Sequence, residues 1–245
     1  MERGIKHRRS IRIPRIKKLY VSSLKFQEKK RGEKMNIIIL GMQGAGKGTQ
    51  AELIKEHYHI AHVCTGDIFR EAYKKKTKLG VKAHDEYWGK GNLVPDDVTN
   101  KLLQERLQEK DCKKGFILDG YPRTIAQARF LDTITSIDMV IDLEINQTLA
   151  IKRLASREQC TKCGTLHGID APPKQKGTCN SCGGELYKRA DDTPEKIKVR
   201  IQEYHEKTRP LIEHYKQQGK LYTVNAGRKI QDVYKEIQEM IQQHM

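Results

Sequence analysis

A glycine-rich segment with one lysine has the clearest chemical use in this sequence. It reads GMQGAGKGT, Gly41 to Thr49, between the apolar run NIIIL and the stretch TQAELIKEHY. Glycines permit a tight turn whose N–H groups point at a polyphosphate, and a following helix adds its positive end. Lys47 could then reach the outer phosphates. A purely structural turn is the alternative, but the strand, loop and helix context favours a phosphate-binding P-loop.

A metal ion beside this loop would need an unusual ligand. The general pattern has Ser or Thr directly after the lysine to hold Mg²⁺, whereas here Gly48 precedes Thr49. Asp119 ends the apolar run GFILD, where a carboxylate can face nucleotide phosphates, through metal-bound water. The alternative is an aspartate that caps a helix or a turn.

Four cysteines have the spacing of a metal site. They form the pattern C-x2-C-x15-C-x2-C at Cys160, Cys163, Cys179 and Cys182. Four thiolates fill the tetrahedral shell of Zn²⁺ and leave no position for water, which indicates a structural site. Iron–sulfur ligation and unligated thiols are the alternatives. We do not expect His167 to be a ligand, because the quartet is complete, and Cys64 and Cys112 are expected to be structural thiols.

The elements that must position these groups alternate along the chain. Helical segments separate five short apolar runs, at Ile37 to Leu40, Ile60 to Cys64, Phe116 to Leu118, Met139 to Leu143 and Leu221 to Val224. A run such as MVIDL shows no alternation of apolar and polar residues, as expected when helices cover both faces of a parallel sheet. The sequence therefore predicts a three-layer α/β fold with a five-stranded parallel sheet.

Two stretches interrupt this alternation and are expected to be insertions. Residues 65–94 are helical and end in the loop signals of GKGNLVPDD, and residues 158–190 are rich in Cys, Gly, Pro and Lys. A long helix is expected after them. Thr193 could cap this helix, and Pro194 falls in its first turn, where proline is favoured.

The formal charge of +16 is concentrated in residues 1–34. This segment has thirteen Lys and Arg against three Glu, a net charge of +10. A start assigned too far upstream, a flexible basic arm and a transit peptide are the alternatives, of which we favour the first. No run approaches the roughly 18 apolar residues of a membrane span, and no secretory signal is recognisable. We therefore expect a soluble, cytoplasmic protein with no membrane partner.

Four motifs together resemble one known family. GMQGAGKGTQ, CTGDIFR, GNLVPDD and GFILDGYPRT occur in the order and spacing of adenylate kinases, and the resemblance covers residues 35–245. It implies reversible Mg²⁺-dependent transfer from ATP to AMP, giving two ADP, by a monomer of the long-lid, zinc-binding type. Residues 65–94 would bind AMP and residues 158–190 would form the lid. Gln43 stands where the family often has proline, a change that we expect to be tolerated.

The resemblance also implies roles for individual residues. The expected catalytic groups are Lys47, Asp119, Arg123, Arg157, Arg189 and Arg200. ATP would be bound by Gly44, Ala45, Gly46, Lys47, Gly48, Thr49, Arg153, Arg157, Thr165, Leu166 and Lys229, with Arg153 packed on the adenine. AMP would be bound by Thr65, Arg70, Asn92, Leu93, Val94, Gly120, Tyr121, Pro122, Arg123, Gln127, Arg189 and Arg200. Of these, Thr65, Gln127 and the backbone of residues 92–94 would contact the AMP base.

Two other functions remain possible at this stage. A nucleic-acid-binding zinc-ribbon protein would explain the basic tail and the cysteines but not CTGDIFR or GYPRT, so we expect no nucleic-acid partner. A kinase of GMP, CMP or UMP on the same fold is the closer alternative.

Overall fold

Five parallel strands form the central sheet of the computed structural model, which describes residues 34–244. The strands are β1 (Met35–Gly41), β2 (Ala61–Cys64), β3 (Gly115–Asp119), β4 (Met139–Glu144) and β8 (Leu221–Asn225), in the order β2-β3-β1-β4-β8. Ile39 of β1 pairs with Asp119 of β3. The P-loop and Asp119 therefore lie side by side at the carboxyl ends of the strands. The predicted five-stranded parallel sheet is confirmed.

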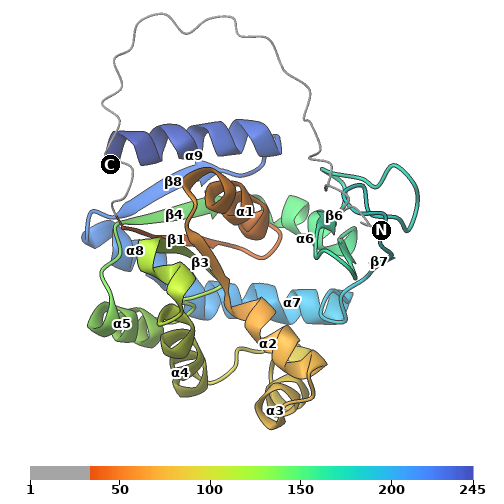
Figure 1. Cartoon of the computed structure of the whole chain (residues 1–245), viewed down its shortest axis with the longest axis horizontal. Coiled ribbons are helices and arrows are strands. Elements are labelled where there is room, and N and C mark those ends of the chain that lie inside the picture. Colours follow the sequence, from red (N-terminus) through yellow and green to blue (C-terminus); the bar gives the residue numbers. More distant parts are fainter. Residues whose placement is uncertain (1–33, 245) are drawn as a thin grey trace, which may run out of the picture. The chain divides into compact units, whose positions relative to one another are not determined.

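Helices cover both faces of this sheet (Figure 1). Ile37 and Ile39 pack in one apolar cluster with residues of α1 (Lys47–Tyr58) and α9 (Ile230–His244). Ile38 and Leu40 pack in a second cluster with residues of α4 (Asp96–Leu107), α5 (Ile125–Ile134) and α8 (Pro210–Gln217). Successive strand residues point to opposite faces, so the central strand β1 is buried on both faces. The three-layer α/β class is confirmed.

Residues 65–94 form two helices and a 3₁₀ turn: α2 (Thr65–Lys74), α3 (Lys78–Glu86) and η1 (Trp88–Lys90). Thr77 caps α3 by accepting a hydrogen bond from the N–H of Gly80 at 3.0 Å. A Cβ on Gly80 would lie 2.2 Å from the backbone carbon of Ala72, so the two helices can cross this closely only at a glycine. Phe69 and Val94 pack in the small apolar core beneath them.

Residues 158–190 contain a small antiparallel sheet next to α6 (Gln147–Ala155). Its strands are β5 (Glu158–Cys160), β6 (Leu166–His167) and β7 (Leu186–Tyr187), in the order β6-β5-β7. The next helix is α7 (Pro194–Glu203). Thr193 caps this helix as predicted, because its side chain accepts a hydrogen bond from the N–H of Lys196. A π turn, η3 (Tyr204–Thr208), separates α7 from α8. The turn η2 (Lys110–Lys114) precedes β3.

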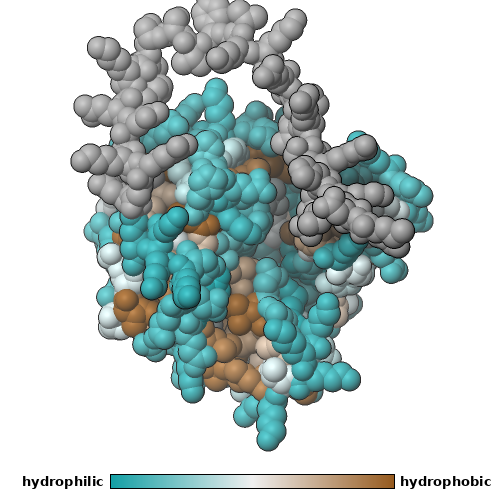
Figure 2. Space-filling model, in the orientation of Figure 1, coloured by the Kyte–Doolittle hydropathy of each residue, from teal (hydrophilic) through white to brown (hydrophobic). Residues whose placement is uncertain are grey.

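The surface of the described residues shows no sign of a membrane span. Figure 2 shows mostly hydrophilic side chains on the face drawn, with smaller hydrophobic areas between them. No helix within residues 34–244 combines the length and apolar character needed to cross a bilayer. The predictions for the basic tail fall on residues 1–33, outside the described residues, and on Lys34, which is exposed.

Candidate active site

The P-loop joins the end of β1 to α1 and offers backbone N–H groups to an anion. Gly41, Gly44 and Gly46 have φ angles of 134°, 86° and 91°. A Cβ on Gly44 would lie 2.5 Å from the backbone oxygen of Ala150 on α6, so the loop needs glycine here. The first N–H groups of α1 have no partner within the helix. Loop and helix end together form an anion-binding site.

Lys47 is the first residue of α1, and its side chain turns back over the loop. Its Nζ donates to the backbone oxygens of Gly41 at 2.8 Å and Met42 at 3.0 Å. Burial lowers the pKa of Lys47 to about 8, against the opposing attraction of the Asp119 carboxylate. A buried cation held among neutral oxygens gains energy when an anion arrives, so the site is prepared for phosphate.

Asp119 is a buried carboxylate at the end of β3. Burial by itself would raise the pKa of Asp119, but the neighbouring His62 ring and the charge of Lys47 hold it below its usual range. The His62 Nε2 lies 3.6 Å from Asp119 Oδ2, and its Nδ1 lies 2.7 Å from Glu52 Oε1. Although burial opposes it, these two carboxylates raise the pKa of His62 to about 9. Asp119 is therefore ionised beside the P-loop.

Two arginines are held together by acidic residues between β7 and α7. Arg157 donates through Nε and Nη2 to the two carboxylate oxygens of Asp192, at 2.8 and 2.7 Å. Arg200 donates to Asp192 at 2.9 Å and lies 3.2 Å from the carboxylate of Asp191. Such two-pronged contacts fix the plane of a guanidinium group. Arg157 and Arg200 are thus aimed into the same space.

Two further arginines face this space with less compensation. Arg123 Nε donates to the Gly120 oxygen at 2.8 Å, and the guanidinium has no ion pair among residues 34–244. Burial and the charge of Arg200 lower the pKa of Arg123. Burial, Arg70 and Arg157 together lower the pKa of Arg189 to about 10. Like-charged guanidinium groups collected in one place indicate a site for a highly charged anion.

A large cavity of about 750 Å³ connects these groups. Its lining includes the P-loop, Asp119 and the arginines, together with Thr165 and Leu166. Arg153, Arg228 and Ile230 also line it. Arg153 Nη1 donates to the Ala226 oxygen at 2.9 Å. The cavity can accommodate a polyphosphate at the loop and a flat group near Arg153.

A smaller cavity adjoins the first and brings together most of the residues expected to contact AMP. It is lined by Thr65, Arg70, Asn92, Leu93, Val94, Gly120, Arg123, Gln127 and Arg200. The Gln127 Oε1 accepts from the Arg123 N–H at 2.7 Å, and its Nε2 donates to Asp96 Oδ1 at 2.7 Å. These two contacts hold the Gln127 side-chain amide in one orientation. In the same cavity, Thr65 Oγ1 donates to the Gly120 backbone oxygen at 2.9 Å.

Comparison with known proteins identifies the family. The sequence matches the adenylate kinase family model over residues 39–220. An adenylate kinase of Enterococcus faecalis is 46% identical over 217 residues, covering 86% of this chain and 100% of that protein. Those of Archaeoglobus fulgidus and Bacillus subtilis are 47% and 45% identical, covering 85% and 84% of this chain and 98% of each relative. The chain belongs to the adenylate kinase family.

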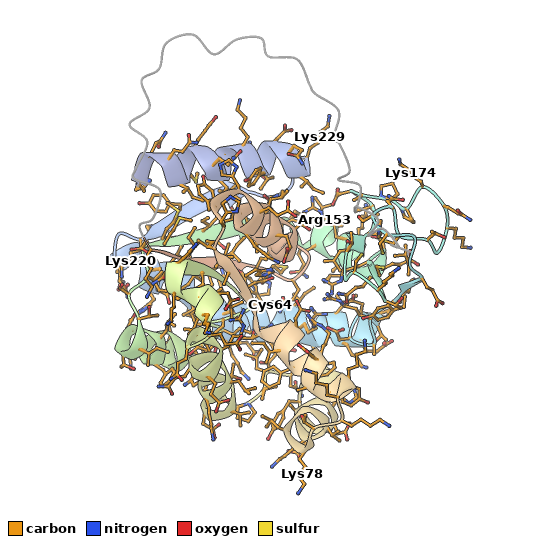
Figure 3. The ribbon with its side chains drawn as sticks, viewed as in Figure 1. Cys64, Lys78, Arg153, Lys174, Lys220 and Lys229 are labelled. Carbon is orange, nitrogen blue, oxygen red and sulfur yellow. The ribbon has the colours of Figure 1, made fainter. Side chains whose placement is uncertain are left out.

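Two residues that the adenylate kinase resemblance implicated lie outside both cavities. Tyr121 is fully buried, and its hydroxyl donates to Asn100 Oδ1 at 2.6 Å and lies 3.1 Å from the backbone oxygen of Gln127. It supports Gln127 from behind. Lys229 is exposed and precedes α9, where Figure 3 labels it, whereas its neighbour Arg228 lines the large cavity. Pro122 and Arg189 line the large cavity only.

The sequence analysis missed several residues that organise the site. Asp192 holds Arg157 and Arg200, His62 contacts Asp119, and Gln159 accepts from Arg189 Nε at 2.8 Å. The adjacent aspartates at 191 and 192 directly follow Arg189 and Ala190, so their charges were a usable signal. Nothing in the sequence near His62 indicated its partner.

The four cysteines converge, as their spacing predicted. Their sulfur atoms all lie within 4.8 Å of one another, with Cys160 and Cys182 3.5 Å apart and Cys163 and Cys179 3.6 Å apart. Thiolates about 2.3 Å from a tetrahedral Zn²⁺ would be separated by about 3.8 Å. The N–H groups of residues 162 and 181 approach the Cys160 and Cys179 sulfurs at 3.4 Å each. The four thiols therefore have the geometry of a metal site.

Proposed function

We propose that this chain catalyses reversible phosphoryl transfer from ATP to AMP, giving two ADP. The observation that carries the proposal is the junction of the two cavities, because Arg70, Arg123 and Arg200 line both. The larger cavity contains the P-loop for a donor triphosphate, and the smaller one contains the residues expected to contact an acceptor base. A phosphoryl group passing between them would move among guanidinium groups, which bind phosphate oxygens and neutralise charge.

The chain's own residues supply positioning and electrostatic stabilisation. The P-loop N–H groups orient the donor phosphates, and Lys47 follows the charge that develops on the transferred group. Arg157 and Arg200, fixed by Asp192, would contact that group from the side of residues 158–190. Residues 65–94 are proposed to bind AMP and residues 158–190 to close over ATP, so that water does not accept the phosphoryl group.

Mg²⁺ is the expected companion of ATP, and the residues present are compatible with it. Asp119 is an ionised oxygen donor, and it lines the large cavity together with Thr49. Mg²⁺ prefers one or two carboxylates together with phosphates and water. Asp119 would hold the ion through its water shell, and the ion would neutralise charge on the outer phosphates.

Adenine is the acceptor base that the smaller cavity favours. After its contacts with Arg123 and Asp96, the Gln127 amide oxygen can accept one more hydrogen bond and the amide nitrogen can donate one more. An amide can meet the ring nitrogen and the amino group of adenine together. Guanine reverses these donors and acceptors, and pyrimidines leave part of the cavity empty. AMP is therefore the proposed acceptor over GMP, CMP and UMP.

Gln127→Leu is expected to lower kcat/KM for AMP by roughly 10- to 100-fold, because buried polar groups lose their partners. The KM for ATP should change little, since Gln127 lines only the smaller cavity. The preference for AMP over GMP should narrow. Steady-state kinetics with each monophosphate at saturating MgATP measure both ratios.

The matched control is Gln104→Leu, at an exposed position of α4. It should leave every constant near that of the unmodified protein. The proposed acceptor would be wrong if the unmodified protein used GMP, CMP or UMP as readily as AMP, or if Gln127→Leu left the AMP preference unchanged.

We propose Zn²⁺ as the ion held by Cys160, Cys163, Cys179 and Cys182. With four thiolate ligands the ion has no open position, so its contribution is structural. Residues 158–190 contain three strands of two or three residues each, too little to form a core alone. Binding of the ion is then part of the folding free energy of this insertion.

Cys179→Ser is expected to reduce the bound zinc from about one ion per chain to nearly none and to lower the midpoint of thermal unfolding. Metal analysis after dialysis with reductant, together with a thermal melt, measures both. Lys162→Ala is the control, because its exposed side chain lies in the same loop and the N–H contact to Cys160 remains. An undiminished zinc content in Cys179→Ser would contradict the site.

The proposed enzyme is a monomer that acts in the cytoplasm. Residues 35–245 are proposed to contain all of the catalytic machinery.

A further inference from the structure

A tight turn in residues 158–190 reaches toward the helix that carries Arg153. Gly168 and Ala171 exchange backbone hydrogen bonds of 3.3 and 3.1 Å, which places Ile169 and Asp170 at the tip of the turn. We call these four residues the 168–171 turn. Because the turn is closed by its own backbone, its two tip residues have defined positions relative to the rest of the insertion.

The 168–171 turn is docked on α6 by a backbone contact. The N–H of Ile169 donates to Ser156 Oγ at 3.2 Å, and this hydroxyl donates in turn to the Arg153 oxygen at 3.1 Å. Ser156 directly follows α6. The contact uses the N–H of Ile169, so it survives any change of the neighbouring Asp170 side chain.

Asp170 adds an ionic contact to this docking. Its Oδ2 lies 2.6 Å from the Nε of Arg153, whose Nη1 also donates to the Ala226 oxygen at 2.9 Å. The Arg153 side chain is 12% exposed and that of Asp170 is 40% exposed. All three residues line the large cavity, and Figure 3 labels Arg153. The guanidinium is thus held between a main-chain oxygen after β8 and a carboxylate of the insertion.

We propose that Asp170 is a positioning residue for the donor nucleotide: it fixes Arg153 beside the donor base and so links docking of the 168–171 turn to ATP binding. The inference rests on the proposed function and on the role that the family resemblance implies for Arg153, which is to pack on the adenine of ATP. The Arg153 guanidinium has both of its contacts only when the turn is docked. A nucleotide that needs Arg153 in this orientation therefore binds better to the docked state and stabilises it.

The negative charge of Asp170 by itself predicts the opposite effect on ATP binding. An experiment can therefore distinguish a positioning role of Asp170 from a purely electrostatic one. Asp170 is an anion in a cavity that receives a polyanion. Removing it should by charge alone strengthen ATP binding. If Asp170 acts through Arg153, its removal should weaken ATP binding instead.

Equilibrium titration with a non-hydrolysable ATP analogue and Mg²⁺ tests this without relying on turnover. In Asp170→Ala we expect the Kd to rise roughly two- to five-fold, the range for a partly exposed ion pair. Glu185→Ala makes the same charge change on an exposed residue of the same insertion, and its Kd should be unchanged or lower. The Kd for AMP should be unchanged in both variants.

The pathway through Arg153 is tested by a double substitution. Arg153→Met should weaken analogue binding, and adding Asp170→Ala should then cause no further loss of binding, because the partner of Asp170 is already absent. An Asp170→Ala protein that binds the analogue as well as or better than the unmodified protein would overturn the inference. The inference would also be overturned if Asp170→Ala weakened analogue binding equally in a protein that already contains Arg153→Met. Failure of the unmodified protein to bind the analogue would instead reject the proposed function.

Discussion

Lys47→Ala is expected to lower kcat by roughly 10²- to 10³-fold, the scale for a placed group that stabilises charge in the transition state. The Lys47 Nζ is held over the P-loop by the oxygens of Gly41 and Met42, at the position where donor phosphates would lie. These two backbone oxygens are its only hydrogen-bond acceptors among residues 34–244. The fold should therefore persist, with an unchanged circular dichroism spectrum.

The same side chain predicts a dependence on pH. Burial lowers the pKa of Lys47 to about 8, so in the free protein the cation is present below this pH and is lost above it. Because phosphates favour the protonated amine, kcat/KM for ATP should fall as the pH rises through about 8. This fall should be absent from the residual activity of Lys47→Ala.

Lys101→Ala, at an exposed position of α4, is the control for loss of a lysine. It should retain full activity and the same pH profile as the unmodified protein. Near-native turnover by Lys47→Ala would contradict the assignment of the P-loop as the donor site.

Arg123→Met should reduce kcat/KM for AMP by roughly 10²- to 10³-fold and at the same time raise the midpoint of thermal unfolding. Arg123 lines both cavities, so it can contact the acceptor phosphate and the transferred group. Without nucleotide, burial and Arg200 lower its pKa, which means that its positive charge destabilises the folded state. Methionine fills similar space without that charge.

The hydrogen bond lost in this variant leaves no buried acceptor without a partner. Gly120 oxygen accepts from Arg123 Nε at 2.8 Å but also from Thr65 Oγ1 at 2.9 Å. Activity by steady-state kinetics and stability by a thermal melt without nucleotide should thus move in opposite directions. Arg129→Met, exposed on α5, should change neither. A fall in both stability and activity would show that Arg123 is mainly structural.

The sequence was sufficient to predict features whose cause is local. The sheet follows from strands buried on both faces, the P-loop from glycines with positive φ, and the convergence of the four cysteines from their two closely spaced pairs. In each of these, neighbouring residues in the chain contain the physical reason for the structure. The cap at Thr193 is of the same kind.

Other features of the structure were not predicted. The expected long helix after Thr193 is interrupted before Pro210, which has no N–H to donate to the preceding turn; this cause is local, and the proline is present in the sequence. The Arg209 N–H instead bonds to the Tyr204 oxygen at 2.8 Å, which widens the turn. Tyr121 and Lys229 were placed by motif position alone, but their directions depend on packing against Asn100 and on the start of α9.

Phosphoryl transfer from ATP to AMP is tested most directly by the stoichiometry of nucleotides when purified protein is mixed with MgATP and AMP. Phosphorus NMR resolves ATP, AMP, ADP and free phosphate in one sample. One ATP and one AMP should disappear for every two ADP formed, without release of phosphate, and ADP alone should return to the same mixture. Consumption of ATP with release of phosphate while AMP remains intact would contradict the proposed transfer.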